Sequence, residues 1–170
     1  MPTPIPFIIS EIGPDRLDAV HDLWLGMHRH HAAIGSHPLV TDEATAWQRR
    51  RALYHGWLTA GEAFLLLAEA ATEPVGYAIV HLQTGPDDTF PLGERYAEVY
   101  SLSVSPAYRG QGIGSALLDA AEARLAAMDI VDIAIAAMVE NEAALRLYTS
   151  RGFVAREVVM YRFGTIPDLG

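Results

Sequence analysis

The chain has 170 residues, of which 51% are hydrophobic and 19% are charged. That composition excludes an intrinsically disordered chain, and the length suits one ordinary domain with a sizeable core. The 21 acidic and 12 basic residues give a net charge of −9, which disfavours nucleic acid and anionic membrane surfaces as partners. The absence of cysteine excludes disulfides, thiolate metal sites and a cysteine nucleophile.

The sequence predicts a soluble, cytoplasmic protein with no membrane partner. Its most apolar windows, residues 64–71 and 130–139, have the length of strands and are interrupted by acidic residues, so neither can span a membrane. No basic stretch precedes an apolar one at the N-terminus, and we therefore expect no signal peptide. No linker or repeat divides the chain, so residues 1–170 are expected to form a single domain.

The N-terminal half, about residues 7–60, predicts one strand and two helices. Pro14 suits the first position of a helix, and apolar side chains then recur at steps of three and four residues. Thr41 or Asp42 is expected to cap the second helix. The predicted elements are a strand at 7–12, a helix at 14–34, and a helix from 41–43 to about 58.

The C-terminal half, residues 63–163, predicts strands that alternate with helices after an initial hairpin. Near-continuous apolar runs indicate strands buried on both faces of a sheet. The order of elements is typical of a mixed sheet with helices packed on it. The predicted strands cover 63–70, 75–83, 94–104 and 130–139, with a strand or tight strand pair at 153–163, and the helices run from about 114 to 128 and from 141 to 151.

The strand at 94–104 alternates in side-chain character, which allows its two faces to be assigned. With a period of two, one face carries the larger side chains and the other carries the smaller ones. The predicted first face consists of Tyr96, Glu98, Tyr100, Leu102 and Val104, and the second of Ala97, Val99, Ser101 and Ser103.

The most informative segment is residues 104–115, Val-Ser-Pro-Ala-Tyr-Arg-Gly-Gln-Gly-Ile-Gly-Ser. Three alternating glycines between a strand and a helix let the backbone approach a ligand and point successive amides into one concavity. The helix N-terminus adds its positive dipole end, and Arg109 adds a charge with a geometry suited to phosphate. These features together predict a pyrophosphate-binding site.

Other interpretations of this turn fit less well. A dinucleotide fingerprint needs the spacing G-x-G-x-x-G, whereas the spacing here is G-x-G-x-G. A Walker loop needs a Gly-Lys-Ser/Thr sequence, and no lysine lies near the turn. A turn that only connects a strand to a helix would explain the glycines, but it leaves Arg109 and Pro106 without a role.

Two blocks of the sequence resemble the GCN5-related N-acetyltransferase (GNAT) superfamily. The run Arg-Gly-Gln-Gly-Ile-Gly, residues 109–114, matches its acetyl-CoA pyrophosphate motif. The run Asn-Glu-Ala-Ala-Leu-Arg-Leu-Tyr, residues 141–148, followed by Gly152-Phe153, matches its Asn-x-x-Ala-x-x-x-Tyr helix. The resemblance covers roughly residues 63–163, while residues 7–60 match only in the order of elements.

The resemblance implies the fold and the donor. The fold would be α/β (α+β), with a GNAT-like mixed, mostly antiparallel central sheet of six to seven strands flanked by about four helices. Residues 7–60 would form the acceptor side and residues 63–163 the half that binds the acyl donor, acetyl-CoA. The strand ending at Val104 would splay away from the strand at 130–139 to admit the pantetheine arm. The implied donor-binding residues are Leu102, Ser103, Val104, Arg109, Gly110, Gln111, Gly112, Ile113, Gly114, Ser115, Asn141 and Tyr148.

Two residues are candidates for the chemistry. An attacking amine must lose a proton, and Glu98 has the spacing to the strand end of the family's base glutamate, although a water relay or an ordinary strand glutamate is the alternative. Tyr148 matches the family tyrosine that protonates the leaving thiolate, and packing of its ring is the alternative. Asn141 matches a family asparagine, but helix capping alone would explain it.

The first helix carries candidate acceptor-side residues. We expect Trp24, His28, His31 and Tyr100 to line the acceptor pocket, since the first helices flank that side in the resembling family. A zinc site at the histidines is the weaker interpretation because carboxylates are sparse nearby, so no metal is expected. The run of arginines at 49–51 spans three helix faces and indicates a solvated patch.

The sequence therefore predicts an acetyl-CoA-dependent N-acetyltransferase that acts on a primary amine of a small molecule or peptide by direct transfer. The alternative is a non-catalytic acyl-CoA-binding or regulatory module on the same fold, since a fold does not guarantee activity. The net charge of −9 is compatible with a cationic acceptor. The resemblance also favours a homodimer, because members of the family are often dimers.

Overall fold

The structure is a computed structural model that describes residues 5–35, 42–85 and 91–162. Five strands form one sheet in the order β1-β2-β3-β4-β5, antiparallel except for the last pair. The elements are β1 (Ile8–Ile12), the 3-10 helix η1 (Pro14–Val20), α1 (His21–Ile34), α2 (Glu43–Ala60), β2 (Ala63–Ala70), β3 (Glu73–Thr84), β4 (Arg95–Val104), the 3-10 helix η2 (Pro106–Tyr108), α3 (Ile113–Ala126), β5 (Ile133–Ile135) and α4 (Glu142–Ser150).

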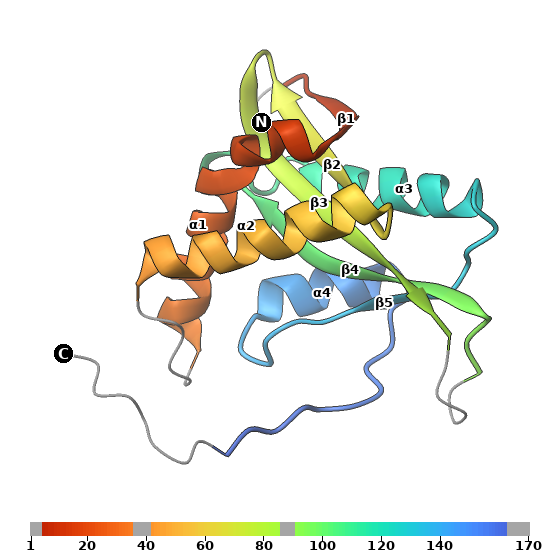
Figure 1. Cartoon of the computed structure of the whole chain (residues 1–170). Coiled ribbons are helices and arrows are strands. Elements are labelled where there is room, and N and C mark those ends of the chain that lie inside the picture. Colours follow the sequence, from red (N-terminus) through yellow and green to blue (C-terminus); the bar gives the residue numbers. More distant parts are fainter. Residues whose placement is uncertain (1–4, 36–41, 86–90, 163–170) are drawn as a thin grey trace.

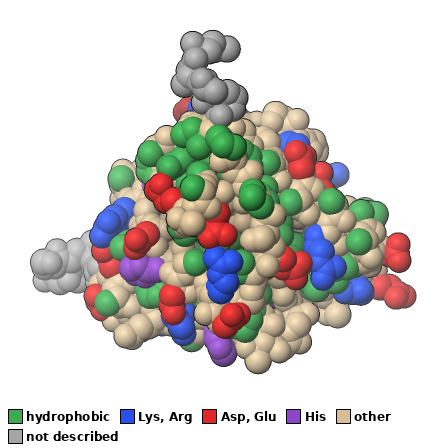
Figure 2. Space-filling view, turned by 90° about the horizontal axis from the view of Figure 1, so that it is seen from above, with side chains coloured by type: hydrophobic (Ala, Val, Ile, Leu, Met, Phe, Trp, Pro, Cys, Tyr) green, Lys and Arg blue, Asp and Glu red, His purple; other side chains and the backbone are tan. Residues whose placement is uncertain are grey.

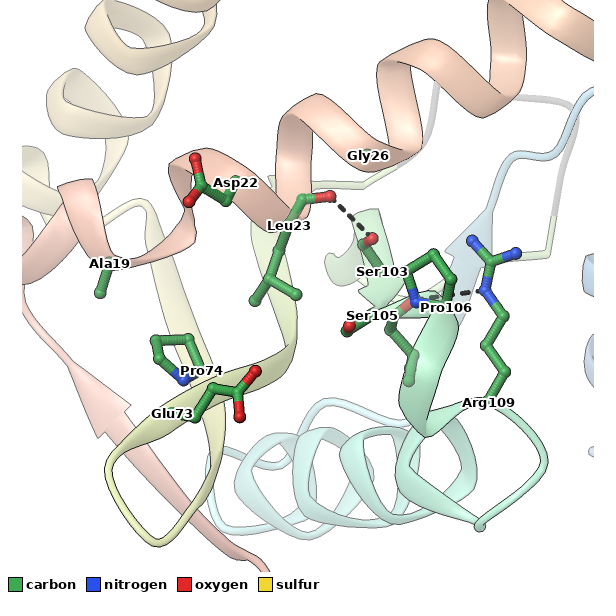
Figure 3. Close-up of a pocket in the computed structure, with 11 residues that line it drawn as sticks. Ala19, Asp22, Leu23, Gly26, Glu73, Pro74, Ser103, Ser105, Pro106 and Arg109 are labelled. Carbon is green, nitrogen blue, oxygen red and sulfur yellow. Dashed lines mark hydrogen bonds between the residues drawn. The ribbon is translucent and has the colours of Figure 1, made fainter.

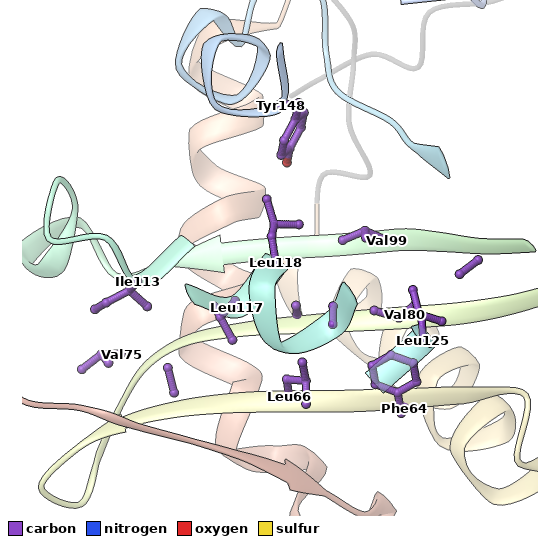
Figure 4. Packing of buried hydrophobic residues seen from close by; sticks show 14 of the residues in the cluster. Phe64, Leu66, Val75, Val80, Val99, Ile113, Leu117, Leu118, Leu125 and Tyr148 are labelled. Carbon is purple, nitrogen blue, oxygen red and sulfur yellow. The ribbon is translucent and has the colours of Figure 1, made fainter. Parts of the chain in front are cut away.

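Helices cover both faces of this sheet, as Figure 1 shows. The sheet and helices α3 and α4 bury one core cluster, which includes Leu66, Val80 and Leu117 (Figure 4). The sheet and helices α1 and α2 bury a second cluster, which includes Leu67 and Tyr54. A central sheet with apolar faces on both sides has to bury each face, which explains why β2 and β3 are almost continuously apolar. The predicted mixed α/β fold is confirmed.

The N-terminal elements differ from the prediction in one detail. Pro14 does begin a helical segment, but its first turns are 3-10, and the α-helix starts only at His21. The Asp42 carboxylate caps α2 by accepting hydrogen bonds from the amides of Ala44 (3.3 Å) and Thr45 (3.0 Å). The alternative cap, Thr41, lies outside the described residues.

Strand β4 contains a β-bulge at Tyr100. In the β3–β4 ladder, Val80 pairs with Val99 and Ile79 pairs with Ser101, so Tyr100 is an extra residue without a partner on β3. An extra residue shifts the alternation of side chains by one position. Ser101 and Tyr100 both face α2, where the Tyr54 hydroxyl donates to Ser101 Oγ at 2.6 Å.

The bulge makes the predicted face assignment of this strand wrong. Glu98 was expected to share a face with Leu102 and Val104, but it pairs with His81, whose ring stacks on Trp57 of α2. Leu102 and Val104 instead pack against the core under α3. The residues before the bulge and those after it therefore follow opposite phases, and Glu98 points to the side of α1 and α2.

The strand predicted at 130–139 is much shorter. Strand β5 has three residues and pairs in parallel with β4 only from Ala97 to Val99. The bulge at Tyr100 follows directly, and it redirects β4 away from the continuation of β5. Among the residues that the structure describes, the last five of β4 therefore have no strand partner on the side of β5.

The strand predicted at 153–163 is also wrong over the part that the structure describes. Residues 153–162 belong to no helix or strand and leave the sheet, as the blue trace of Figure 1 shows. Val154, Val158 and Met160 are all more than two-thirds exposed. A high β-propensity forms no strand without a neighbour to pair with, and β5 offers an edge of only three residues. The described residues thus form five strands, instead of six to seven.

Surface charges of both signs are interspersed over the face shown in Figure 2. Several of them form ion pairs between distant parts of the chain, such as Arg16 with Glu69 (3.0 Å) and Arg124 with Glu11 (3.0 Å). None of the helices in the described ranges is long and apolar enough to cross a membrane.

Gly76 of β3 permits the close packing of α3 on the sheet. A β-carbon at this position would lie 3.0 Å from Ile113 Cγ2 and 3.2 Å from both Leu117 Cδ1 and the Ser103 carbonyl oxygen. Replacing Gly76 by alanine is expected to lower the free energy of unfolding by about 1–3 kcal/mol, because the extra methyl group overpacks this contact. Urea denaturation followed by circular dichroism measures the change.

The matched control for this substitution is Gly56→Ala. Gly56 is exposed within α2, and a β-carbon there would meet no atom within 4 Å. Alanine is the better helix former, so this variant is expected to be unchanged or more stable, by up to about 1 kcal/mol. Equal stability of the two variants would contradict the packing role of Gly76.

Candidate active site

The glycine-rich turn lies between the end of β4 and the start of α3, as the sequence predicts. Gly110 and Gly112 have φ values of +75° and +83°, a conformation that favours glycine. A β-carbon on either residue would meet no atom within 4 Å, so the turn faces open space. No side chain caps α3, whose first amides are thus available to an anion in front of the turn. This geometry suits a pyrophosphate group.

Arg109 and Gln111 stabilise the turn from outside. The Arg109 Nε donates to the carbonyl oxygen of Val104 at 3.3 Å, and the Gln111 amide donates to the carbonyl oxygen of Ala107 at 3.4 Å. The Arg109 guanidinium therefore lies along the end of β4 (Figure 3), with nitrogens left to meet a phosphate.

A hollow of about 230 Å³ adjoins this turn on the side of α1 (Figure 3). Its walls come from α1, the start of β3 and the end of β4. Ser103 is buried in the wall and donates to the carbonyl oxygen of Leu23 at 3.0 Å. Asp22, Glu73 and Arg109 supply charged groups at its border. Its lining includes Ser103 and Val104, which belong to the part of β4 that has no partner on β5.

The predicted donor-binding residues lie together around the β4–α3 junction. Leu102 and Val104 are partly buried on the unpaired part of β4, whereas the Ile113 side chain is 2% exposed and belongs to the core. Ile113 can therefore offer a ligand only its backbone. Gly114 lies close to α4, since a β-carbon there would be 3.4 Å from Leu147 Cδ2. Ser115 is partly buried in the first turn of α3.

Helix α4 brings Tyr148 to the other side of this junction. Asn141 precedes the helix, and its side-chain oxygen accepts from the amide of Ala144 at 3.2 Å. In this structure Asn141 therefore acts as a helix cap. The Tyr148 ring is buried against Phe153 and points from α4 toward Leu118 and the sheet (Figure 4). Burial raises the pKa of Tyr148 to about 12, so its hydroxyl keeps its proton at neutral pH.

Glu98 belongs to a polar group on the opposite face of the sheet. Its register partner is His81, and the Gln83 amide nitrogen lies 2.8 Å from His81 Nδ1 and 3.4 Å from Glu98 Oε2. The His81 ring is fixed by stacking on Trp57 at 3.9 Å between centroids. One amide thus contacts both an imidazole and a carboxylate, which orients two side chains that can each act as a base.

The predicted acceptor-side residues divide into two groups. Trp24 is 2% exposed, so its indole belongs to the core under the site and cannot line an open pocket. His28 stacks on Trp24 at 4.9 Å. Burial lowers the pKa of His31, with smaller contributions from the charges of its neighbours. Tyr100, at the bulge, meets Trp57 edge to face at 4.8 Å. Tyr100 and the two histidines therefore border the side of the sheet that Glu98 faces.

Sequence reasoning missed part of this site. Trp57, His81 and Gln83 were not singled out, and Arg50 was assigned to a solvated patch, although it is partly buried. The spacing of Arg50 and Trp57 by seven residues places both on one face of α2, and His81 and Gln83 are two apart on one face of β3. Those periodicities were available in the sequence. Within the described ranges, no group of three or more histidine, aspartate and glutamate side chains is arranged to hold a metal ion.

Comparison with known proteins agrees with the architecture and the turn. Residues 19–153 match the sequence pattern of the acetyltransferase (GNAT) family, and the chain belongs to this family. It is 34% identical over 147 residues to a mycothiol acetyltransferase of Thermobispora bispora, which covers 83% of this chain and 45% of that protein. It is 36% identical over 91 residues to the mycothiol acetyltransferase of Amycolatopsis mediterranei, covering 54% of this chain and 30% of that protein. The chain spans less than half the length of these curated relatives.

Solved structures share the fold. A GCN5-related N-acetyltransferase from Ralstonia eutropha superimposes with a TM-score of 0.77 at 22% identity, over 94% of this chain and 100% of the other. An acetyltransferase from Clostridium acetobutylicum, crystallised with acetyl-CoA, gives a TM-score of 0.73 at 14% identity, over 93% of this chain and 96% of the other. At these identities the likeness establishes the GNAT fold alone.

A substitution at Gly112 tests the turn as an anion site. Gly112→Asp is expected to abolish binding of coenzyme A in calorimetry, because its carboxylate would stand at the amides and repel phosphate. Gly152→Asp is the matched control, since Gly152 has a similar φ of +87° and also meets no atom within 4 Å, so it carries the same backbone strain and charge. Equal affinity of the two folded variants would contradict the assignment.

Proposed function

We propose that this chain catalyses transfer of an acetyl group from acetyl-CoA to a primary amine of a small molecule or peptide. The observation that carries the proposal is the glycine turn at the start of α3, which faces open space beside the unpaired part of β4. The relatives named mycothiol acetyltransferase and the neighbour crystallised with acetyl-CoA support it. The experiment is a thiol-release assay with acetyl-CoA and a panel of amines. Binding of acetyl-CoA without turnover of any amine would favour a non-catalytic module.

The chain offers the donor two kinds of contact. The amides of Gly110 to Gly114 and the side chain of Arg109 would hold the pyrophosphate, as the geometry of the turn favours. The free backbone groups of Leu102 to Val104 would hold the pantetheine arm, since an unpaired strand edge offers regularly spaced donors and acceptors. No metal is part of this proposal.

Proton transfer on the acceptor side is assigned to Glu98. In the transfer, the amine nitrogen bonds to the thioester carbonyl carbon, the carbon–sulfur bond breaks, and the nitrogen loses a proton. Glu98 takes that proton directly or through water, and Gln83 with His81 fixes the carboxylate on the α2 side. Tyr148 donates its hydroxyl proton to the departing sulfur and regains one from solvent.

The proposal also covers the acceptor, the cellular location and the oligomeric state. Mycothiol acetyltransferases share sequence with this chain, and their name supports a small-molecule acceptor. Because the reaction needs acetyl-CoA, we place the protein in the cytoplasm. The homodimer stays a prediction.

Tyr148→Phe separates binding from chemistry. The variant is expected to lose about two orders of magnitude in kcat, because general acid catalysis contributes roughly 10²–10⁴-fold, while its affinity for acetyl-CoA stays within about twofold of the native value. Since the pKa of Tyr148 is about 12, its ionisation should cause no fall in rate below about pH 11. Single-turnover kinetics and calorimetry measure both quantities, and full activity would return Tyr148 to a packing role.

Glu98→Gln tests the base. The variant keeps the shape of the side chain and removes its ability to accept a proton, so the rate is expected to fall most near neutral pH. The rate should recover as rising pH supplies more free amine. Two acceptors of different basicity separate this effect from ionisation of the amine itself. A rate profile that matches the native enzyme with both acceptors would mean that water or another residue takes the proton.

A further inference from the structure

Arg50 of α2 is a partly buried cation that rests on aromatic rings. Its guanidinium carbon lies 5.0 Å from the ring centroid of Tyr100 and 5.6 Å from that of Tyr54. Its Nη1 donates to the Tyr54 hydroxyl at 3.4 Å. A guanidinium has five N–H donors, and this is the one hydrogen bond that Arg50 makes within residues 5–35, 42–85 and 91–162.

Arg50 differs in its hydrogen bonds from two other arginines of the N-terminal half. Arg51 holds Asp18 with two hydrogen bonds, and Arg29 holds Glu43 in the same way. No carboxylate of the described residues lies within 4 Å of Arg50. Cation–π contacts compensate for part of the lost hydration of a buried arginine, but they leave its planar donors unused. A ligand anion would use them.

The position of Arg50 connects it to the proposed chemistry. Tyr100, under the guanidinium, is the bulge residue of β4, and it also meets the edge of Trp57. Trp57 stacks on His81, the register partner of Glu98. Arg50 and Trp57 are seven residues apart on one face of α2, about 10 Å along the helix axis. Arg50 and Glu98 thus lie at opposite ends of one aromatic row on the α2 face of the sheet. This row consists of the rings of Tyr100, Trp57 and His81.

The charge around Arg50 favours a monoanion over a phosphate. The polar groups near the guanidinium are the phenols of Tyr54, Tyr77 and Tyr100, and His31 is its basic neighbour. Burial lowers the pKa of His31 and so favours its uncharged form, which leaves the guanidinium of Arg50 as the positive group over Tyr54 and Tyr100. One guanidinium matches one carboxylate in charge and in its two parallel hydrogen bonds.

We propose that Arg50 binds a carboxylate of the acceptor, so that the acceptor is a small amine that also carries a carboxylate, as amino acids do. This inference rests on the proposed function. The carboxylate lies against Arg50 over Tyr100, and the amine lies toward Glu98. The net charge of −9 is compatible with a cationic acceptor, and the positive charge of Arg50 favours one that carries a carboxylate besides its amine.

The test compares acceptors that differ only in the carboxylate. The pairs are L-phenylalanine with phenethylamine, L-alanine with ethylamine, and γ-aminobutyrate with propylamine. The native protein is expected to prefer the carboxylate-bearing member of at least one pair by about tenfold or more in kcat/KM, since a hydrogen-bonded ion pair in a partly buried site discriminates to that degree. Arg50→Gln should remove the preference, by lowering kcat/KM for the carboxylate-bearing member more than for the plain amine.

Control variants separate recognition from folding. Arg49→Gln removes an exposed arginine next along the same helix and should keep the full preference. Arg50→Lys keeps the positive charge but loses the planar pair of N–H donors, so it should keep part of the preference. Circular dichroism checks that all variants fold. An equal loss with both members of a pair, or no preference in the native protein, would overturn the proposal, as would a preference for phosphoethanolamine over β-alanine.

Calorimetry keeps the outcome distinct from that of the proposed function. If no amine is turned over, the proposed function fails. Binding of N-acetyl-L-phenylalanine, compared with N-acetylphenethylamine, still decides whether Arg50 holds a carboxylate. Tighter binding of the former to the native protein, lost in Arg50→Gln and kept in Arg49→Gln, supports the site. Equal binding of both compounds to all three proteins rejects it.

Discussion

The extra residue in β4 determines most of the arrangement around the site. Without the bulge at Tyr100, a strict alternation would turn Glu98 toward the same core as Leu102 and Val104. With it, Glu98 faces α2, while the later residues still pack under α3. The same bulge ends the pairing with β5 at Val99 and leaves free backbone beyond it. A single insertion thus separates the proposed acceptor side from the proposed donor side on one strand.

Each side is then completed by a different half of the chain. On the proposed donor side, the glycine turn and the amides of α3 provide positive dipoles without side chains, which leaves room for a bulky anion. On the proposed acceptor side, α2 provides Trp57 and Arg50 beside Tyr54, which is buried and donates to Ser101. In the proposed function, the first half of the chain therefore contributes acceptor recognition, and the second contributes donor binding.

Local features were predictable from the sequence, and features that depend on distant pairing were not. The glycine spacing at 110–114 and the caps Asp42 and Asn141 act within a few residues of themselves, so the sequence reveals them. The bulge at Tyr100 depends on how β4 aligns with β3. The alternation of side chains along β4 alone does not reveal that alignment. The segment 153–162 has strand-like composition but lacks a neighbour, and propensity alone cannot supply one.

The short contact between β4 and β5 has a consequence for motion. Nine pairs join β3 to β4, but three parallel pairs join β4 to β5. Amide hydrogens of β5 should therefore exchange with solvent through local opening, at a much lower free energy than those of β3. A sheet built this way is stiff in its centre and compliant at one margin. A long flexible ligand could then enter between β4 and β5, because this edge of the sheet opens while both core clusters stay packed.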